Sequence, residues 1–317
     1  MKILVFGLGA LGSVYSCLLK RAGHRVSGID IPAVASRIGR QGVQIQGIWG
    51  EHQAYLDQVA ASVDQLADRD FDLIIVTVKA YQTAAVSQVL KSCIKDNTYV
   101  LLAQNGYGNY EAASEYIAAD RLILGRVIFG AVTLEPGISQ VTVIADDVLL
   151  GHPHQLIDED RLQQLADVFC EAGIPTRVSP NIMELIWAKI IYNSALNPLG
   201  AILEVPYGKL AEMEWSRQLM DQIINEIFAV LKALEQPTPW KDGEAYRSSF
   251  YRQMVPSTAA HRASMLQDIQ RGRKTEIEAL NGAVVRLGER LGVETPVNRV
   301  ITSLLQCKET LGSIKAG

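Results

Sequence analysis

The stretch KILVFGLGALGSVYSCLLKRAGHRVSGID, residues 2–30, decides the fold of the first half of the chain. It predicts a short β-branched strand, a glycine turn, a helix from about Ala10 to Ala22 and a second strand at Arg25–Ile29. A strand, a helix and a strand in about thirty residues make a βαβ unit, from which parallel sheets are built.

Three glycines follow the first predicted strand in the pattern G-x-G-x-x-G. The first permits a tight turn, the second lets the backbone approach a pyrophosphate, and the third allows close helix packing. The start of the helix supplies N–H donors for an anion. The pattern predicts dinucleotide binding, against the alternative of a merely structural turn, by the backbone of Gly7, Leu8, Gly9, Ala10, Leu11 and Gly12.

Asp30 stands at the end of the second strand, 18 residues after Gly12. A carboxylate at this place hydrogen-bonds the adenosine ribose and repels a 2′-phosphate, which favours NAD(H). The alternative is that Asp30 caps the loop before Pro32. Because Arg37 and Arg40 lie nearby and could receive a 2′-phosphate, the choice of cofactor stays open at this point.

Strand-like and helical segments alternate further along the first half. The runs 71–79, 98–106 and 121–134 are typical of strands, and the patterns at 82–94 and 109–117 are typical of helices. Such alternation predicts a parallel sheet that is covered on both faces. We interpret 141–153 as a later, irregular addition to that sheet, followed by an amphipathic helix at 158–173 and a strand at 175–179.

Strand signals almost vanish after Ser179-Pro180, and long helical patterns take over, including 213–235 and 276–292. We therefore predict an α/β protein with two domains. Residues 1–179 form a Rossmann-type doubly wound parallel sheet, and residues 180–317 form an all-α domain.

The helical segment WAKIIYNSALNPLG, residues 187–200, carries Lys189, Asn193 and Asn197 at a spacing of four. Positions i, i+4 and i+8 lie along one face of a helix. Since a buried lysine without a partner is costly, this polar row predicts one wall of a polar site. The alternative is a surface lysine that passes apolar neighbours, with asparagines that cap turns where Pro198 changes the backbone.

Composition restricts the partners of this chain of 317 residues. The formal net charge of −4 gives no basic footprint, so we expect a small-molecule ligand and neither nucleic acid nor membrane. The uncharged run 3–19 resembles a signal peptide, but its glycines are spaced for the turn. No other uncharged run approaches the ~20 residues that span a bilayer.

Cysteine and histidine positions predict no metal site. The four cysteines lie far apart, which fits a reducing cytoplasm and no zinc site. We interpret the five histidines as surface or loop residues because none has metal-ligand spacing; they are His24, His52, His152, His154 and His261.

Five segments in this order resemble the ketopantoate reductases, enzymes of pantothenate and coenzyme A synthesis, over nearly the whole chain. They are KILVFGLGALGSVYS, DLIIVTVKAYQT, LLAQNGYGNYE, WAKIIYNSALNPLGAI and SMLQDIQRGRKTEIEALNG. Members of this family hold NADPH and an α-keto acid between a Rossmann domain and a helical domain. The resemblance implies reduction of 2-dehydropantoate to pantoate by hydride transfer.

The resemblance also assigns roles to residues that match the family motifs. Lys189 matches the catalytic lysine, which protonates or hydrogen-bonds the ketone oxygen. Glu276 matches a glutamate near this lysine and the nicotinamide ribose, Asn193 and Asn197 match substrate-binding asparagines, and Ser264 matches the serine that binds the substrate carboxylate. The alternatives are a helix-dipole carboxylate for Glu276 and a cap for Ser264.

Four further matches lie on the cofactor side. Asn105 matches an asparagine between cofactor and substrate, and Lys79 and Gln82 match residues beside the cofactor. Ala131 corresponds less surely to a backbone position that contacts the cofactor. An ordinary turn is the alternative for Asn105, and a solvated strand end is the alternative for Lys79.

Two departures leave the cofactor and the substrate open. The family usually has an arginine for the NADPH 2′-phosphate where this chain has Ile31, and segment 139–153 lacks the family's glycine- and histidine-rich character. A reductase of another 2-oxo or 3-hydroxy acid is therefore the second hypothesis, and a dinucleotide-binding sensor without turnover is the third. The complete set of matched residues argues against the sensor. The apolar helices of the second domain are compatible with a homodimer.

Overall fold

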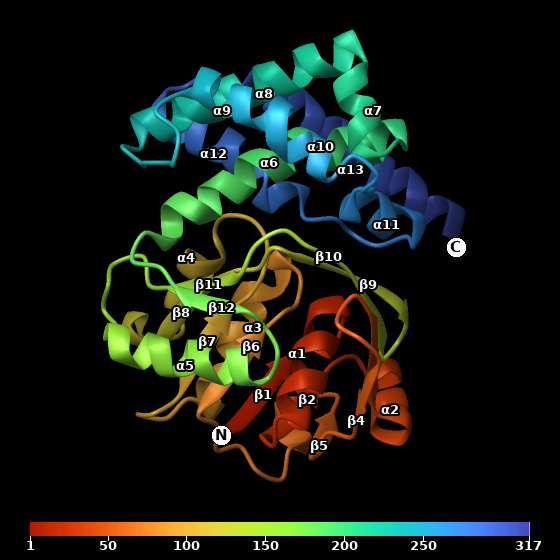
Figure 1. The fold of residues 1–317 in the computed structure, drawn as a ribbon, viewed down its shortest axis with the longest axis vertical. Helices are drawn as coiled ribbons and strands as arrows, with labels where there is room; N and C mark the ends of the chain where they lie inside the picture. The colour runs from red at the N-terminus through yellow and green to blue at the C-terminus, as the bar shows by residue number, and fades with distance from the viewer. Residues whose placement is uncertain (317) are drawn as a thin grey trace. The chain divides into compact units, whose positions relative to one another are not determined.

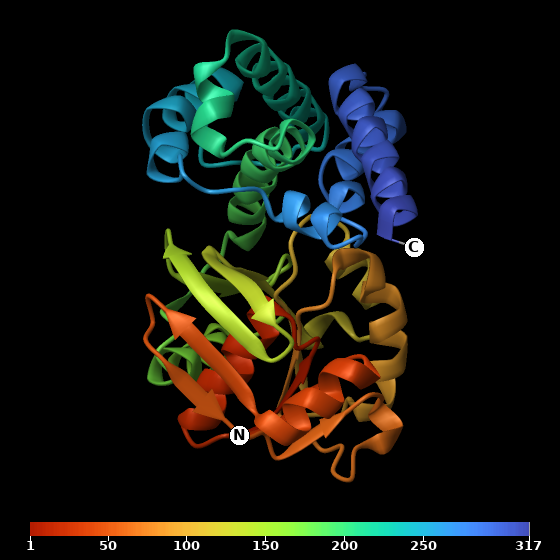
Figure 2. The same ribbon diagram turned by 90° about the vertical axis from the view of Figure 1, so that its right-hand side faces the viewer.

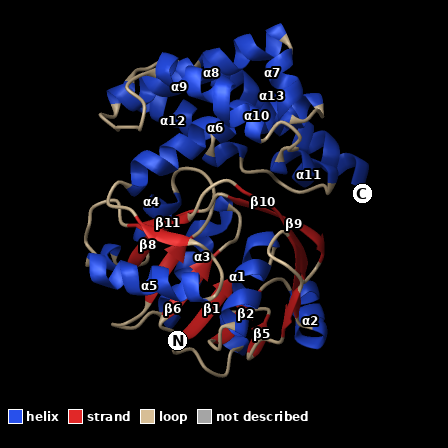
Figure 3. Ribbon diagram, in the orientation of Figure 1, coloured by secondary structure: helices blue, strands red, loops and turns tan. Residues whose placement is uncertain are grey.

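The computed structural model describes residues 1–316, which divide into two compact units. The first unit comprises Met1–Asn105 and Asn109–Ile182, and the second comprises Gly106–Gly108 and the chain from Met183 onwards. Figure 3 shows that the described strands all belong to the first unit, whereas helices and loops build the second.

The first unit contains an eight-stranded sheet with the order β12-β11-β8-β7-β6-β1-β2-β5. Its neighbouring strands are parallel except at β11, which runs antiparallel to β8. The predicted first strand and the predicted strand at Arg25–Ile29 are thereby confirmed as neighbours. The strands are β1 (Lys2–Phe6), β2 (Arg25–Ile29), β5 (Gln58–Ala60), β6 (Leu73–Val76), β7 (Tyr99–Leu102), β8 (Leu122–Arg126), β11 (Val148–Gly151) and β12 (Thr176–Val178).

The central strands are apolar along their whole length because both faces of the sheet are covered. In β6 all four residues of the run LIIV are buried. The helices of this unit are α1 (Ala10–Arg21), α2 (Pro32–Gln41), α3 (Thr83–Leu90), α4 (Asn109–Ser114) and α5 (Glu159–Glu171), with short 3₁₀ turns η1 (Val63–Gln65), η2 (Ala80–Gln82), η3 (Lys91–Cys93) and η4 (Ala119–Arg121).

A second, four-stranded sheet with the order β4-β3-β10-β9 also belongs to the first unit. Helix α1 packs against its strands on one side and against β1 and β2 on the other (Figure 2). The aromatic rings of Tyr15 and Phe129, with centroids 6.0 Å apart, join α1 to this sheet. The strands are β3 (Val43–Gly47), β4 (His52–Ala54), β9 (Phe129–Glu135) and β10 (Ile138–Ile144).

Two sequence runs that we assigned to a single sheet each divide between two sheets. Run 121–134 supplies β8 to the large sheet and β9 to the small one, and run 141–153 continues β10 and then supplies β11. An ion pair marks the crossing, where the buried Arg126 at the end of β8 contacts the exposed Asp146, just before β11, at 2.5 Å. Because this pair joins residues 20 apart in sequence, no local pattern reveals it.

The second unit is helical, as predicted. The long helix expected near 213–235 is α8, and the helix that ends at Gly292, which has a φ of +69°, begins at Asn281 after a separate 3₁₀ turn. The elements are α6 (Ile182–Leu203), α7 (Tyr207–Glu212), α8 (Glu214–Ala233), α9 (Gly243–Ser249), η5 (Phe250–Met254), α10 (Val255–Ser257), α11 (Ser264–Gln270), η6 (Ile277–Ala279), α12 (Asn281–Leu291) and α13 (Pro296–Ala316).

Each unit has its own hydrophobic core. All four cysteines are free of disulfides, and Cys17 and Cys93 are buried. Along the described part of the chain, no helix combines the length and the apolar character that a membrane span requires.

Candidate active site

Four loops with predicted cofactor residues follow the carboxyl ends of adjacent parallel strands (Figure 1). The glycine turn, residues 7–12, follows β1; Asp30 follows β2; Lys79 follows β6; and Asn105 follows β7. The carboxyl ends of parallel strands share one edge of a sheet, and here the strand order reverses at β1, between β2 and β6. Dinucleotides bind at such switch points.

Tight contacts show why two positions in the glycine turn require glycine. Gly7 has a φ of +98°, and a Cβ there would lie 2.9 Å from the main-chain nitrogen of Val78. A Cβ on Gly12 would lie only 1.8 Å from the carbonyl oxygen of Gly7. Thr77 donates its hydroxyl hydrogen to that same oxygen at 2.5 Å. The turn is therefore closed by backbone contacts that any side chain would disrupt.

Gly9 is different, because a Cβ there would meet no atom within 4 Å. It is exposed and forms the N-cap of α1, and its carbonyl oxygen accepts the first helical hydrogen bond, from Ser13 at 2.9 Å. Open space beside the N–H groups that begin a helix is the cradle that a pyrophosphate needs. The glycine turn fits a dinucleotide on this observation.

Asp30 connects the end of β2 to the glycine turn. Its carboxylate accepts hydrogen bonds from the N–H of Leu8 at 2.5 Å and from the N–H of Ile31 at 2.7 Å. Helix α2 takes Ile31 as its N-cap and has no side-chain cap, so Asp30 does not cap that helix. An ionised carboxylate has about four acceptor sites, so a ribose hydroxyl can bind in addition to these two N–H groups.

The two arginines of α2 are both engaged within the first unit. Arg37 forms an ion pair with Glu135 of β9 and also donates to Gln41 at 3.1 Å. Arg40 is exposed and donates to the carbonyl oxygen of Ser36 at 3.3 Å.

A polar network holds the loop after β7. The Thr83 hydroxyl lies 2.9 Å from the Asn109 side-chain oxygen and accepts a hydrogen bond from Gln104 at 2.7 Å. Asn109 in turn donates to the main-chain oxygen of Asn105 at 3.0 Å. Thr83 directly follows Gln82 at the start of α3, so this network connects the predicted loop after β6 with the predicted loop after β7.

Ala131 lies in β9 of the small sheet, opposite Val141 of β10. Its place therefore differs from that of the glycine turn, Asp30, Lys79, Gln82 and Asn105, which follow strands of the large sheet. Its contact with a cofactor stays a prediction.

In the second unit the polar row lies on α6, which runs unbroken from Ile182 to Leu203. Lys189 and Asn193 are half-buried, and Asn197 is only 6% exposed. Pro198 lies within this helix and does not end it. The row therefore occupies one face of a largely buried helix, which argues against the snorkelling surface lysine.

A tyrosine that the sequence did not single out contacts this row. Tyr207, the first residue of α7, is 3% exposed and donates its hydroxyl hydrogen to the side-chain oxygen of Asn197. Its ring lies 6.1 Å from that of Tyr192 on α6 and 5.3 Å from that of His261, between ring centroids. No periodicity relates residues 197 and 207, so only the tertiary structure could reveal the pair.

The two remaining predicted residues of this unit begin short elements. Ser264 is the exposed first residue of α11, and the preceding residue Ala263, not Ser264, occupies the N-cap position. Glu276 is 8% exposed and precedes η6, where its carbonyl oxygen accepts the N–H of Ala279 at 3.0 Å.

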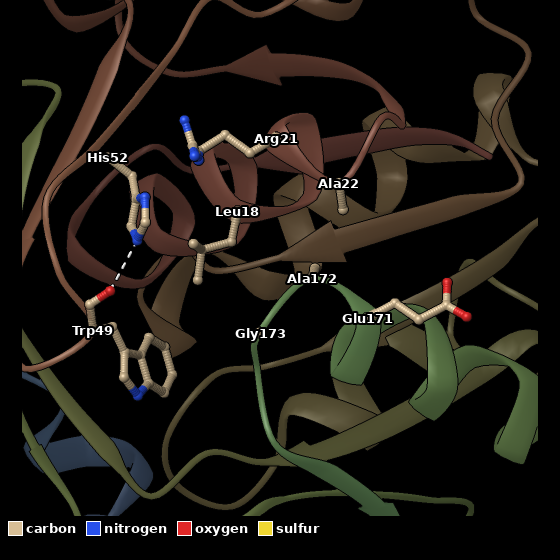
Figure 4. A pocket seen from close by; sticks show the side chains of 8 residues that line it. All are labelled: Leu18, Arg21, Ala22, Trp49, His52, Glu171, Ala172 and Gly173. Atoms are coloured by element: carbon tan, nitrogen blue, oxygen red, sulfur yellow. Dashed lines mark hydrogen bonds between the residues drawn. The ribbon is translucent and has the colours of Figure 1, made fainter.

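A pocket of about 350 Å³ lies in the first unit, and Figure 4 shows the side chains that line it. Arg21, Trp49, His52 and Glu171 line it, and the imidazole Nε2 of His52 lies 2.9 Å from the main-chain oxygen of Trp49. Arg21 is the last residue of α1, twelve residues long, so the pocket is one helix length, about 18 Å, from the glycine turn. It does not belong to the predicted cofactor site.

No group of three or more histidine, cysteine, aspartate or glutamate side chains within the described residues could hold a metal ion. His152 follows β11 in a loop but is only 2% exposed, so it is a buried loop residue. Burial lowers its pKa.

Comparisons with known proteins cover both units. The family model described as "Ketopantoate reductase PanE/ApbA" matches residues 3–154, and the model described as "Ketopantoate reductase PanE/ApbA C terminal" matches residues 181–309. A 2-dehydropantoate 2-reductase of Aquifex aeolicus is 44% identical over 309 residues, which cover 98% of this chain and 97% of that protein.

Two solved structures are similar over 98% of this chain and 99% of their own. The ternary structure of D-mandelate dehydrogenase with NADH and anilino(oxo)acetate has a TM-score of 0.87 and 30% identity. A PanE/ApbA family ketopantoate reductase from Ralstonia eutropha JMP134 has a TM-score of 0.86 and 28% identity.

Proposed function

Because the chain belongs to the ketopantoate reductase family, we propose that it reduces 2-dehydropantoate to pantoate with a nicotinamide dinucleotide. The observation that carries the proposal is the polar row on α6. It places a half-buried lysine and two asparagines on one face of a largely buried helix. A ketone that is being reduced needs such groups, because negative charge grows on its oxygen.

Lys189 is the proposed proton donor. Its ammonium group stabilises the charge on the ketone oxygen and supplies the proton that completes the hydroxyl group. When bound, the reduced dinucleotide supplies the hydride. Glu276 is proposed to orient Lys189 and to keep it protonated, since a carboxylate favours the charged form of an amine.

The proposed substrate residues provide neutral donors and a hydroxyl group. Asn193 and Asn197 hydrogen-bond the polar groups of the keto acid without competing for its proton. Ser264 is proposed to bind the carboxylate, and its exposure at the first position of α11 leaves its hydroxyl accessible. Asn105 is proposed to contact both the keto acid and the cofactor.

The residues that would hold the dinucleotide are the glycine turn, Lys79, Gln82, Asn105, Ala131 and Glu276, with Asp30 on the adenosine ribose. We propose that NADH is preferred to NADPH. Asp30 places a carboxylate beside the glycine turn, and the position of the family's usual arginine is occupied by Ile31, which is 63% exposed. Arg37, which could have received a 2′-phosphate, is already paired with Glu135.

A second candidate is the reduction of a different 2-oxo acid by the same residues. The similarity to a D-mandelate dehydrogenase that was solved with NADH supports it, as does the atypical segment 139–153, which forms most of β10 and all of β11. A sensor without turnover is disfavoured, because a binding module needs no proton donor.

The test is the oxidation of NADH and of NADPH by the purified protein, measured separately with ketopantoate and with a panel of other 2-oxo acids. Efficient turnover of ketopantoate supports the proposal. A much higher kcat/KM for another 2-oxo acid would instead support the second candidate function. Cofactor binding without turnover of any acid supports the sensor.

A cytoplasmic location and a homodimer also stay predictions. The free cysteines fit a reducing compartment, and the described side chains of α13 include the exposed Val300, Leu304 and Leu311.

A further inference from the structure

We propose that Tyr207 is a positioning residue that fixes the amide of Asn197 and joins the two substrate-binding elements of the helical unit. The inference rests on the proposed function, because it takes Asn197 and Ser264 as substrate residues. Tyr207 itself touches neither the keto acid nor the cofactor in this account, and it acts through the two elements that it connects.

The first connection is the hydrogen bond to α6. The Tyr207 hydroxyl donates to the side-chain oxygen of Asn197, and both residues are more than nine-tenths buried. Burial raises the pKa of Tyr207 far above its usual range, so the phenol keeps its proton near neutral pH. With its oxygen engaged in this way, the Asn197 amide offers its two N–H groups to a substrate oxygen.

The second connection is to the segment that leads into Ser264. The N–H of Tyr207 donates to the main-chain oxygen of His261 at 3.0 Å, and the N–H of Gly208 donates to that of Ala259 at 2.9 Å. The imidazole of His261 also packs on the Tyr207 ring, with centroids 5.3 Å apart. The start of α7 therefore holds this segment by two backbone hydrogen bonds and one ring contact.

Close packing completes the arrangement. A Cβ on Gly200 of α6 would lie 3.3 Å from the Cβ of Ala263 and 3.5 Å from Cε1 of Tyr207. A Cβ on Gly208 would lie 2.9 Å from the Cβ of Ala259. Small residues thus let α6, α7 and segment 259–263 approach one another, and Ser264 follows that segment directly.

A fixed Asn197 amide determines which substrate groups can bind beside it, and so how the substrate is oriented. An asparagine side chain can rotate its amide by half a turn and exchange donor for acceptor. The Tyr207 hydroxyl prevents this exchange, because the turned amide would present N–H hydrogens to a phenol that also needs an acceptor for its own proton. Substrate oxygens that accept hydrogen bonds are therefore favoured at Asn197 over hydroxyl groups that donate.

The test is a double-mutant cycle with Tyr207→Phe and Asn197→Ala, read as KM for ketopantoate, kcat and the Kd of NADH. Tyr207→Phe should raise KM about five- to tenfold, which corresponds to the net free energy of one neutral hydrogen bond. The change in kcat should be smaller, and the Kd of NADH should stay unchanged. In the Asn197→Ala background the same substitution should change KM less than twofold, because the two residues act as one unit.

Tyr246→Phe is the matched control. Tyr246 is fully buried in the same unit, and its hydroxyl has no hydrogen-bond partner among the described residues, so KM should stay at the wild-type value. A Tyr207→Phe enzyme with the KM of Tyr246→Phe would overturn the inference, and so would an equal increase of KM in both backgrounds. Failure of the wild type to turn over ketopantoate would instead overturn the proposed function, and the assignment of Asn197 with it.

Discussion

The side-chain nitrogen of Asn281 lies 3.1 Å from the main-chain oxygen of Ser194, and it donates the hydrogen bond that α6 lacks at this point. In a regular helix the carbonyl of Ser194 would accept the N–H of residue 198, but residue 198 is a proline without that N–H. Asn281, at the start of α12, is fully buried and also donates to Asn298 at 3.0 Å. An amide from another helix therefore satisfies the carbonyl that Pro198 leaves free, and α6 continues past the polar row.

Substitution of Asn281 should destabilise the helical unit. Asn281→Ala leaves the buried carbonyl of Ser194 without its donor, so we expect the free energy of unfolding to fall by about 1–3 kcal/mol. Denaturant unfolding of the wild type and the variant measures this. Ser194→Ala is the control, because its hydroxyl has no partner among the described residues and its loss should change stability little. If Pro198→Ala, which restores the N–H, does not reduce the effect of Asn281→Ala, the explanation is wrong.

Substitutions in the glycine turn should impair folding at Gly12 and cofactor binding at Gly9. Gly12→Ala forces a Cβ to within 1.8 Å of the Gly7 carbonyl oxygen, so we expect a protein that melts well below the wild type or does not fold. Gly9→Ala meets only open space, so it should fold normally and raise the KM for the dinucleotide at least tenfold. Gly39→Ala, also in open space but in α2, serves as control with unchanged KM. Normal cofactor affinity in Gly9→Ala would contradict the assigned cradle.

Cofactor preference should change with residues 30 and 31. Replacing Asp30 by alanine and Ile31 by arginine removes a carboxylate and adds a cation for the 2′-phosphate. The ratio of kcat/KM for NADPH to that for NADH should therefore rise tenfold or more. Arg37→Ala should leave KM for NADPH unchanged, because the Arg37 guanidinium is already paired with Glu135. An increase of that KM in Arg37→Ala would show that α2 binds the phosphate after all.

Stability should decrease in mild acid because of His152. Its Nε2 lies 2.8 Å from the carbonyl oxygen of Ala119, while its Nδ1 accepts N–H groups of His154 at 3.0 Å and Leu156 at 3.3 Å. This arrangement requires a neutral ring, and burial lowers the pKa of His152 in the folded state. The unfolded state therefore binds the proton more readily, so the free energy of unfolding falls as pH drops below about 6.5, the unperturbed histidine pKa.

Thermal melts of the wild type and of His152→Gln between neutral and mildly acidic pH check this prediction. The variant should lose less stability on acidification than the wild type does. Burial also lowers the pKa of His24 and of His261, so part of the dependence should remain. Substitution of the exposed His154 is the control in these melts. Equal acid sensitivity in His152→Gln and the wild type would exclude His152 as a cause.

Local patterns were sufficient to predict the βαβ unit, the division into α/β and helical parts, and the helical polar row. Each depends on residues within about one element of one another, such as Gly7 and Gly12 or Lys189 and Asn193. The small sheet was not predicted. The run VQIQG of β3 alternates apolar and polar residues as a half-buried strand does, but its partner β10 lies about a hundred residues away, so the run alone does not show which sheet it joins.

The sequence also could not predict the contacts that distant elements make around the candidate residues. The bond from Asn281 to Ser194 and the bond from Tyr207 to Asn197 depend on how helices pack, and neither spacing follows a helical period. The sequence also suggested a change of backbone at Pro198, whereas the helix continues there because Asn281 replaces the missing donor. Propensity alone could not show that compensation.

The role of Lys189 as proton donor is tested by comparing wild type and Lys189→Ala in NADH oxidation with ketopantoate, together with NADH binding. We expect turnover by the wild type and a loss of about 10²- to 10⁴-fold in kcat for the variant, with the Kd of NADH within twofold of the wild type. Lys189→Arg, which keeps the charge but moves it, should recover only part of the rate. Unchanged turnover in Lys189→Ala would contradict the account, because another group would then supply the proton.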